Sequence, residues 1–138
     1  MLKGIGVDIW SVTEMQRLIN ERAPFLEFCF TAAEREYAFG KSQAAQHLAA
    51  RYAAKEAAIK ALAHTNMFEA LAIKGGVDYR EIEVLNDAEG RPYLVFHGKF
   101  AATAKHHGVV KSLVTLSHQD ETAMAFVVFE GEAIREIL

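Results

Sequence analysis

The chain has 138 residues, of which 51% are apolar and 24% charged, fractions that are typical of a folded globular protein. Its net charge of −3 argues against a protein that binds nucleic acid through overall positive charge. The single cysteine, Cys29, excludes an internal disulfide and a cysteine-ligated zinc site. The length predicts one domain over residues 1–138, with a modest core in which a deep cleft is hard to build.

The N-terminal residues do not resemble an export signal. Asp8 interrupts the short apolar run of residues 4–10, whereas a signal peptide needs a continuous apolar core. No apolar stretch approaches the ~20 residues that span a bilayer. With the lone thiol, these features lead us to expect a cytoplasmic protein.

The first half of the chain is predicted to contain one strand followed by three helices. The strand is expected over residues 4–10, and the helices over residues 12–21, 31–40 and 43–63. Ser11 and Thr31 each precede a glutamate by three residues, which is the spacing of a capping box at a helix start. Pro24 is expected to end the first helix, and an aromatic cluster follows it.

The second half is predicted to consist of two hairpins and one helix. The strands are expected over residues 81–85, 93–96, 113–117 and 123–129, and the helix over residues 100–107. Residues 64–80 give the weakest pattern, with a helical turn or two at residues 67–73 and a turn at Gly75-Gly76. Segregated helices and antiparallel hairpins predict an α+β fold, in which an antiparallel sheet packs with the long helix.

The long helix carries the strongest local pattern. Ten of the twenty residues from Ala44 to Ala63 are alanine, which has the best helix propensity and allows close packing. Tyr52, Glu56 and Lys60 are four residues apart and therefore lie on one stripe. One interpretation of the stripe is a solvent-facing Glu56–Lys60 pair worth ~0.3–0.5 kcal/mol; the other is a functional site.

Asp8 and the pair Ser117-His118 are further candidates. An acid within an apolar strand either points to water from an edge strand or is buried with a cation or hydrogen-bond partner. The hydroxyl and imidazole at residues 117 and 118 either bind phosphate oxygens or cap a turn. The remaining histidines show no metal-ligand spacing.

Several motifs, in one order along the chain, resemble those of a known family. Residues 6–9 (GVDI) resemble its glycine-aliphatic-aspartate-aliphatic motif, and residues 30–34 (FTAAE) its F-T-x-x-E motif. Residues 51–62 (RYAAKEAAIKAL) resemble its signature of arginine, an aromatic residue and A-x-K-E-A-x-x-K-A. Matches at residues 82–84, 90–93 and 115–118 follow. The family is holo-[acyl-carrier-protein] synthase, the small class of 4′-phosphopantetheinyl transferases, and the resemblance covers nearly the whole chain.

The resemblance implies a reaction of fatty acid biosynthesis and lipid metabolism. A serine hydroxyl of an apo acyl carrier protein attacks the β-phosphate of coenzyme A, and adenosine 3′,5′-bisphosphate leaves. It also implies a Mg²⁺ cofactor, which is typically held by one or two carboxylates, phosphate oxygens and waters. A further implication is a homotrimer in which neighbouring subunits share each active site.

The resemblance also implies roles for individual residues. Asp8 and Glu56 would hold Mg²⁺, Glu56 or a metal-bound water would act as general base, and Lys60 would neutralise charge on the departing phosphate. Arg51, Ser117 and His118 would contact the coenzyme phosphates. Arg91 and Pro92 would lie near the adenine.

Two departures from the family pattern concern the carrier and the coenzyme. Glu14 stands where the family often has an arginine that grips the carrier, so we expect Arg17 and Arg22, with Met15 and Phe25, to take over this contact. After the signature, residues 63–66 replace a G-T-G loop, and the stretch to Tyr79 is longer. Lys74 with Gly75-Gly76 is a candidate substitute.

There are two alternatives to a general holo-[acyl-carrier-protein] synthase, and these departures support only the first of them. One is a transferase dedicated to a specialised, polyketide-type carrier. The other is a non-catalytic module that binds coenzyme A or the carrier.

Overall fold

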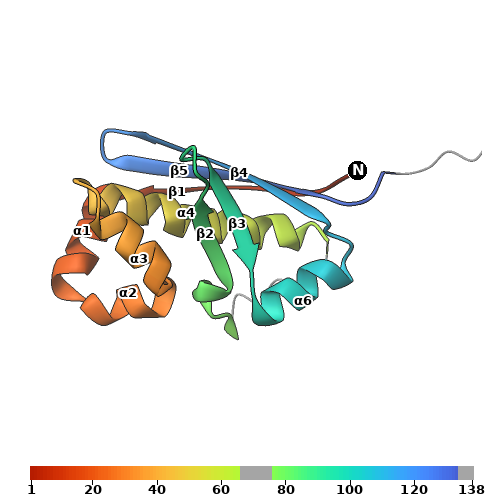
Figure 1. Cartoon of the computed structure of the whole chain (residues 1–138), viewed down its shortest axis with the longest axis horizontal. Helices are drawn as coiled ribbons and strands as arrows, with labels where there is room; N and C mark the ends of the chain where they lie inside the picture. Colours follow the sequence, from red (N-terminus) through yellow and green to blue (C-terminus); the bar gives the residue numbers. More distant parts are fainter. Residues whose placement is uncertain (66–75, 134–138) are drawn as a thin grey trace, which may run out of the picture.

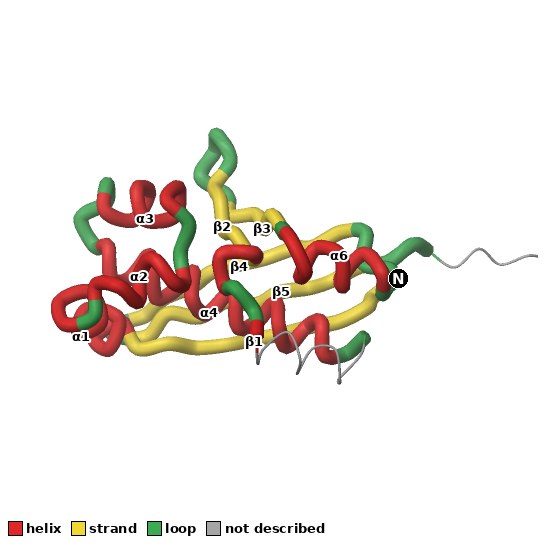
Figure 2. Tube along the Cα trace, turned by 90° about the horizontal axis from the view of Figure 1, so that it is seen from below, coloured by secondary structure: helices red, strands yellow, loops and turns green. Residues whose placement is uncertain are grey.

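The computed structural model describes residues 1–65 and 76–133. In this part of the chain, three antiparallel strands form a sheet in the order β1 (Leu2–Ser11), β5 (Thr122–Glu130), β4 (Lys111–Gln119). The long helix α4 (Ala44–Ala63) runs along one face of this sheet (Figures 1 and 2). The predicted α+β class, with an antiparallel sheet on an alanine-rich helix, is confirmed.

The other elements gather at the two ends and the side of α4 (Figure 1). Helices α1 (Val12–Glu21), α2 (Ala23–Cys29) and α3 (Ala32–Phe39) lie at one end. The hairpin of β2 (Ile82–Asn86) and β3 (Pro92–Phe96) follows the short 3₁₀ helix η1 (Tyr79–Glu81). Helix α6 (Gly98–His106) lies toward the other end.

The core forms where the sheet meets α4. Alternate β5 side chains, from Ala123 to Phe129, are buried against the helix, as expected for a strand with one buried face. Gly4 and Gly6 bring β1 directly onto the helix backbone. A Cβ at Gly4 would lie 2.1 Å from the Ala61 carbonyl oxygen, and one at Gly6 would lie 1.9 Å from that of Ala57. Only glycine therefore fits at these two crossing points.

Local signals predicted most of these elements. Helix α1 spans the predicted residues, and Thr31 and Glu34 form a complete capping box at the start of α3. At Ser11 only half of the box is present: its hydroxyl accepts from the Glu14 backbone N–H (3.0 Å), while the Glu14 carboxylate pairs with Arg17.

Helix α1 ends at Glu21, before Pro24, as predicted, but the sequence analysis did not predict the separate helix α2 over residues 23–29. Pro24 lies in the first turn of α2, where a helix tolerates proline because its missing N–H has no intrahelical partner there. The helical turn predicted at residues 67–73, and Lys74 and Gly75, lie outside the described residues. Within the described ranges, none of the helices has both the length and the apolar character needed to cross a bilayer.

Candidate functional site

Asp8 faces α4 from strand β1. Gly4, Gly6, Asp8 and Trp10 alternate along the strand and therefore share one face. Gly6 lies on the helix backbone at Ala57, and the Trp10 ring packs against that of Tyr52, with centroids 4.6 Å apart. The strand and helix thus run antiparallel, and Asp8 lies between these two contacts.

Lys60 is the cation partner of Asp8. Its Nζ lies 2.9 Å from Asp8 Oδ1 and donates to the Val7 carbonyl at 3.0 Å. The Asp8 side chain is 18% exposed and that of Lys60 is 51% exposed. In the sheet order, β1 is an edge strand, but Asp8 points inward from it. Of the two interpretations of Asp8, the inward-facing acid with a cation partner is therefore the one that the structure supports.

Glu56 lies one turn before Lys60 on α4 and receives two phenolic hydrogen bonds. Tyr79 Oη donates to Glu56 Oε1 at 2.8 Å, and Tyr52 Oη donates to the same oxygen at 3.3 Å. The side chain of Glu56 is half-buried. Asp8 is thus paired with Lys60, and Glu56 lies one turn away, on the part of α4 along which β1 runs.

The two carboxylates of this cluster fit a magnesium site. Mg²⁺ prefers hard oxygen ligands and keeps several waters and phosphate oxygens, so it requires only one or two protein carboxylates. In the described part of the chain, no group of three or more acidic, histidine or cysteine side chains could hold a metal ion by itself. A metal held by Asp8 and Glu56 would therefore complete its coordination from substrate and water.

A second cluster lines a pocket of about 260 Å³ between α4, the β2–β3 hairpin and β4. Four predicted coenzyme contacts border it: Arg51, Pro92, Ser117 and His118. Arg51 is buried, its guanidinium lies 4.3 Å from the Tyr37 ring centroid, and Nη2 donates to Asn86 Oδ1. Among the described residues its Nε has no hydrogen-bond partner, which leaves one buried donor for a ligand.

The pocket residues that sequence reasoning did not name as site candidates include four side chains from α3, α4 and β2: Tyr37, Gln46, His47 and Asn86. Gln46 Nε2 lies 2.9 Å from His118 Nδ1. Burial lowers the pKa of His47, and the positive charge of Arg51 lowers it further. His47 and Arg51 are four residues apart on α4, a spacing that could have identified His47 from the sequence. The pocket therefore concentrates cationic and imidazole groups suited to an anion.

Arg91 lies next to Pro92 but is engaged elsewhere. Its Nε lies 3.1 Å from Asp87 Oδ2, and its Nη2 lies 2.6 Å from Glu89 Oε2. It is exposed and does not line the pocket. Its predicted position near an adenine thus rests on its neighbour Pro92 alone.

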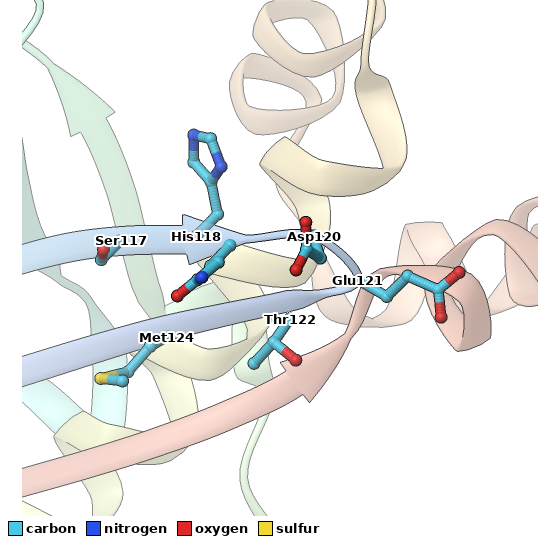
Figure 3. Close-up of a pocket in the computed structure, with 7 residues that line it drawn as sticks. Ser117, His118, Asp120, Glu121, Thr122 and Met124 are labelled. Carbon is cyan, nitrogen blue, oxygen red and sulfur yellow. The ribbon is translucent and has the colours of Figure 1, made fainter.

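The β4–β5 turn forms a larger open hollow of about 730 Å³ (Figure 3). Ser117 and His118 border it together with Gln119, Asp120, Glu121, Thr122 and Met124. In Figure 3, His118 and Ser117 project from opposite sides of β4. His118 faces α4, whereas Ser117 belongs to the outer face of the sheet, so the two side chains do not converge on one point.

The residues predicted for carrier binding are not all on the surface. Met15 is fully buried in the core, so its predicted contact with a carrier is not available. Phe25 is half-buried and packs against Tyr52, with centroids 5.9 Å apart. Arg17 is held by Glu14 (2.5 Å) and Glu21 (2.9 Å). Arg22 is exposed, and within the described residues it makes no ion pair.

The sequence and the fold of this chain are both similar to those of one group of known proteins. The family model of the 4′-phosphopantetheinyl transferase superfamily matches residues 4–127. Holo-[acyl-carrier-protein] synthase from Geotalea daltonii is 37% identical over 131 residues, which cover 94% of this chain and 99% of that protein. The protein of the same name from Geobacter metallireducens is 39% identical, with 94% and 98% of the two chains covered.

Solved structures agree with the sequence matches. The acyl carrier protein synthase of Mycobacterium tuberculosis has a TM-score of 0.72 and 32% identity, with 96% of this chain and 100% of that chain covered. The coenzyme A complex of the synthase from Chronobacterium ammoniagenes has a TM-score of 0.75 and 29% identity, with 94% and 98% covered. The fold and the order of the motifs are thus similar over nearly the full length.

Proposed function

The chain belongs to the holo-[acyl-carrier-protein] synthase family of 4′-phosphopantetheinyl transferases, and from this we propose that it transfers phosphopantetheine from coenzyme A to a serine of an apo acyl carrier protein. The observation that carries the proposal is the cluster of Asp8, Glu56 and Lys60 where β1 runs along α4. The anion-suited pocket around Arg51 supports it. The expected acceptor belongs to fatty acid biosynthesis.

The reaction is a displacement at phosphorus. The serine oxygen forms a bond to the β-phosphorus of coenzyme A, and the bond from that phosphorus to the bridging oxygen breaks. Adenosine 3′,5′-bisphosphate leaves with the bond electrons. Glu56, or a water that it orders, takes the proton of the serine hydroxyl. Lys60 neutralises charge that develops on the departing phosphate.

Asp8 and Glu56 would hold the Mg²⁺ that the family chemistry implies. When bound, such an ion withdraws charge from phosphoryl oxygens and aligns the attacking and leaving groups. The ion pair with Lys60 holds the Asp8 carboxylate facing α4, where it could act as a ligand. Arg51 and His118 are suited to bind coenzyme phosphates, with Ser117 and Pro92 at the rim of the same pocket.

The outer face of the sheet supports self-association. Opposite α4, aligned rows cross the three strands: Ile5–Val128–Leu113, Val7–Phe126–Thr115 and Ile9–Met124–Ser117. Its large apolar side chains are between 39% and 59% exposed: Ile5, Val7, Ile9, Leu113, Met124 and Phe126. A contiguous apolar patch of this kind marks an interaction surface on a water-soluble domain. We propose that two further copies of the chain cover it in a homotrimer.

Phe126→Asp tests this association. A carboxylate in the middle of a buried apolar interface carries a desolvation cost, so we expect the variant to be monomeric where the wild type is trimeric. Phe28→Asp is the matched control, because Phe28 is an exposed phenylalanine on α2, away from the sheet. Sedimentation equilibrium measures both. A monomeric wild type, or a trimeric Phe126→Asp variant, would contradict the assignment of this face.

A panel of carriers tests the function and its alternatives. The protein is incubated with coenzyme A, Mg²⁺ and apo carriers from fatty acid and polyketide synthesis, and each carrier is weighed by mass spectrometry. Modification of the fatty acid carrier is the expected result. Modification of polyketide-type carriers alone would favour the dedicated transferase. If no carrier gains mass, the non-catalytic module becomes the better account.

A further inference from the structure

Two tyrosines hold one oxygen of Glu56. The rings of Tyr52 and Tyr79 stack with centroids 5.7 Å apart and planes 26° apart. Both hydroxyls donate to Glu56 Oε1, at 3.3 Å and 2.8 Å. Two donors on the same oxygen restrict the rotation of the carboxylate as well as its position.

Both phenols remain donors in the working range of pH. Burial and, as the second cause, the negative charge of Glu56 together raise the pKa of Tyr52 to about 12. Burial, followed by the hydrogen bond to Glu56, raises the pKa of Tyr79 as well. Each phenol therefore keeps its O–H as a hydrogen-bond donor to the Glu56 carboxylate oxygen.

The backbone of Tyr79 is anchored by the residue next to Glu56. Lys55 Nζ donates to the Tyr79 carbonyl at 3.0 Å, to the Ile82 carbonyl at 2.6 Å and to Glu34 Oε1 at 2.8 Å. These three bonds satisfy all three donors of the ammonium group. Lys55 and Glu34 are both fully buried. Adjacent residues of α4 thus hold the two ends of Tyr79, Lys55 its carbonyl and Glu56 its hydroxyl.

The 3₁₀ helix η1, which carries Tyr79, is also stabilised by its N-terminal cap. Asp78 caps η1 by accepting from the Arg80 backbone N–H at 2.9 Å, and its carboxylate pairs with the Arg80 side chain at 2.8 Å. The Tyr79 ring therefore comes from a short, doubly anchored segment, although Tyr79 is 23 residues from Glu56 in the chain.

We propose that Tyr79, assisted by Tyr52, is a positioning residue that sets the orientation of the Glu56 carboxylate for metal binding and proton transfer. The inference rests on the proposed function, because that function gives Glu56 two roles: to hold the metal ion and to accept the proton of the serine hydroxyl. Hydrogen-bond partners of metal ligands typically change metal affinity or activity 10–100-fold when they are removed. The family signature accepts any aromatic residue at position 52, so it does not by itself specify the Tyr52 hydroxyl.

Tyr79→Phe tests the proposal, because it removes the hydroxyl and keeps the stacked ring. We expect kcat to fall about tenfold and the half-saturating Mg²⁺ concentration to rise about tenfold. Tyr52→Phe removes the longer bond, so about a threefold change is expected for it. Tyr93→Phe is the control, since Tyr93 is an exposed phenol on β3. A purely structural role would lower the active fraction without changing the Mg²⁺ requirement.

A metal titration without substrate tests the role of Tyr79 independently of the proposed transfer activity. Trp10, the single tryptophan, packs against Tyr52, so quenching of its emission by Mn²⁺ reports metal binding without any substrate. We expect the Mn²⁺ dissociation constant of Tyr79→Phe to be about tenfold higher than that of the wild type. Equal constants, or no Mn²⁺ binding by either protein, would overturn the tyrosine proposal. Absence of transfer by the wild type would instead overturn the proposed function. If Tyr79→Phe does not fold, Tyr52→Phe decides the question by the same titration.

Discussion

Glu56→Gln is expected to reduce phosphopantetheine transfer by about 10²–10⁴-fold, the range attributed to a general acid–base group. The amide has nearly the shape of the carboxylate, and its oxygen can still accept from Tyr79 and Tyr52. It cannot take a proton from a serine hydroxyl, and it is a poorer ligand for Mg²⁺ than an anionic oxygen. The initial rate of carrier modification at saturating coenzyme A measures the effect.

A matched control distinguishes chemistry from folding. Glu36→Gln makes the same change at an exposed position on α3 and should leave the rate unchanged. The melting temperature of Glu56→Gln should stay within a few degrees of the wild type, because its two hydrogen bonds persist. A Glu56→Gln enzyme with a near wild-type rate would remove Glu56 from the mechanism.

Lys55→Met is expected to have the largest effect on stability, a loss of about 3–5 kcal/mol in the free energy of unfolding. The substitution keeps the length and apolar stem of the side chain but leaves the Glu34 carboxylate buried without its cation. It also leaves the Tyr79 and Ile82 carbonyls without their ammonium donor. Burial already lowers the pKa of Lys55, so the charged lysine depends on these partners. Urea unfolding followed by circular dichroism measures the loss.

Lys60→Met supplies the comparison on the same helix. The Lys60 side chain is half exposed, and exposed ion pairs contribute about 0–1 kcal/mol, so its removal should cost little stability. Similar unfolding free energies for the two variants would show that the buried pair does not stabilise the fold.

Local patterns predicted the helices and hairpins because the signals lie within each element. Alanine content, capping residues and strand alternation identified α4, α1 and the β4–β5 hairpin. Helix α2 was missed because a proline such as Pro24 can either follow the end of one helix or stand in the first turn of another. The distinction depends on whether the following aromatic residues pack on α4, which is a tertiary contact.

Contacts between residues that are far apart in the chain could not be predicted from the sequence. A cation partner was one of two alternatives for Asp8, and the identity of the cation, Lys60, depends on which part of α4 lies beside β1, 52 residues later in the chain. Lys55 and Glu34 carry charges that are usually exposed, so no local pattern predicts that both are buried together. Tyr79 follows the least readable segment, and its contact with Glu56 emerges only from the fold. Met15 was predicted to contact the carrier together with Arg17, Arg22 and Phe25, yet its side chain is buried in the core.

The most direct test is to measure the carrier and the nucleotide products in one reaction. Wild-type protein, coenzyme A, Mg²⁺ and an apo acyl carrier protein are combined, and intact mass spectrometry and chromatography follow both. The account predicts one phosphopantetheine per carrier serine and one adenosine 3′,5′-bisphosphate per carrier modified, with no reaction when a chelator removes the metal. A carrier that keeps its apo mass, or one modified at the full rate with the metal removed, would contradict the account.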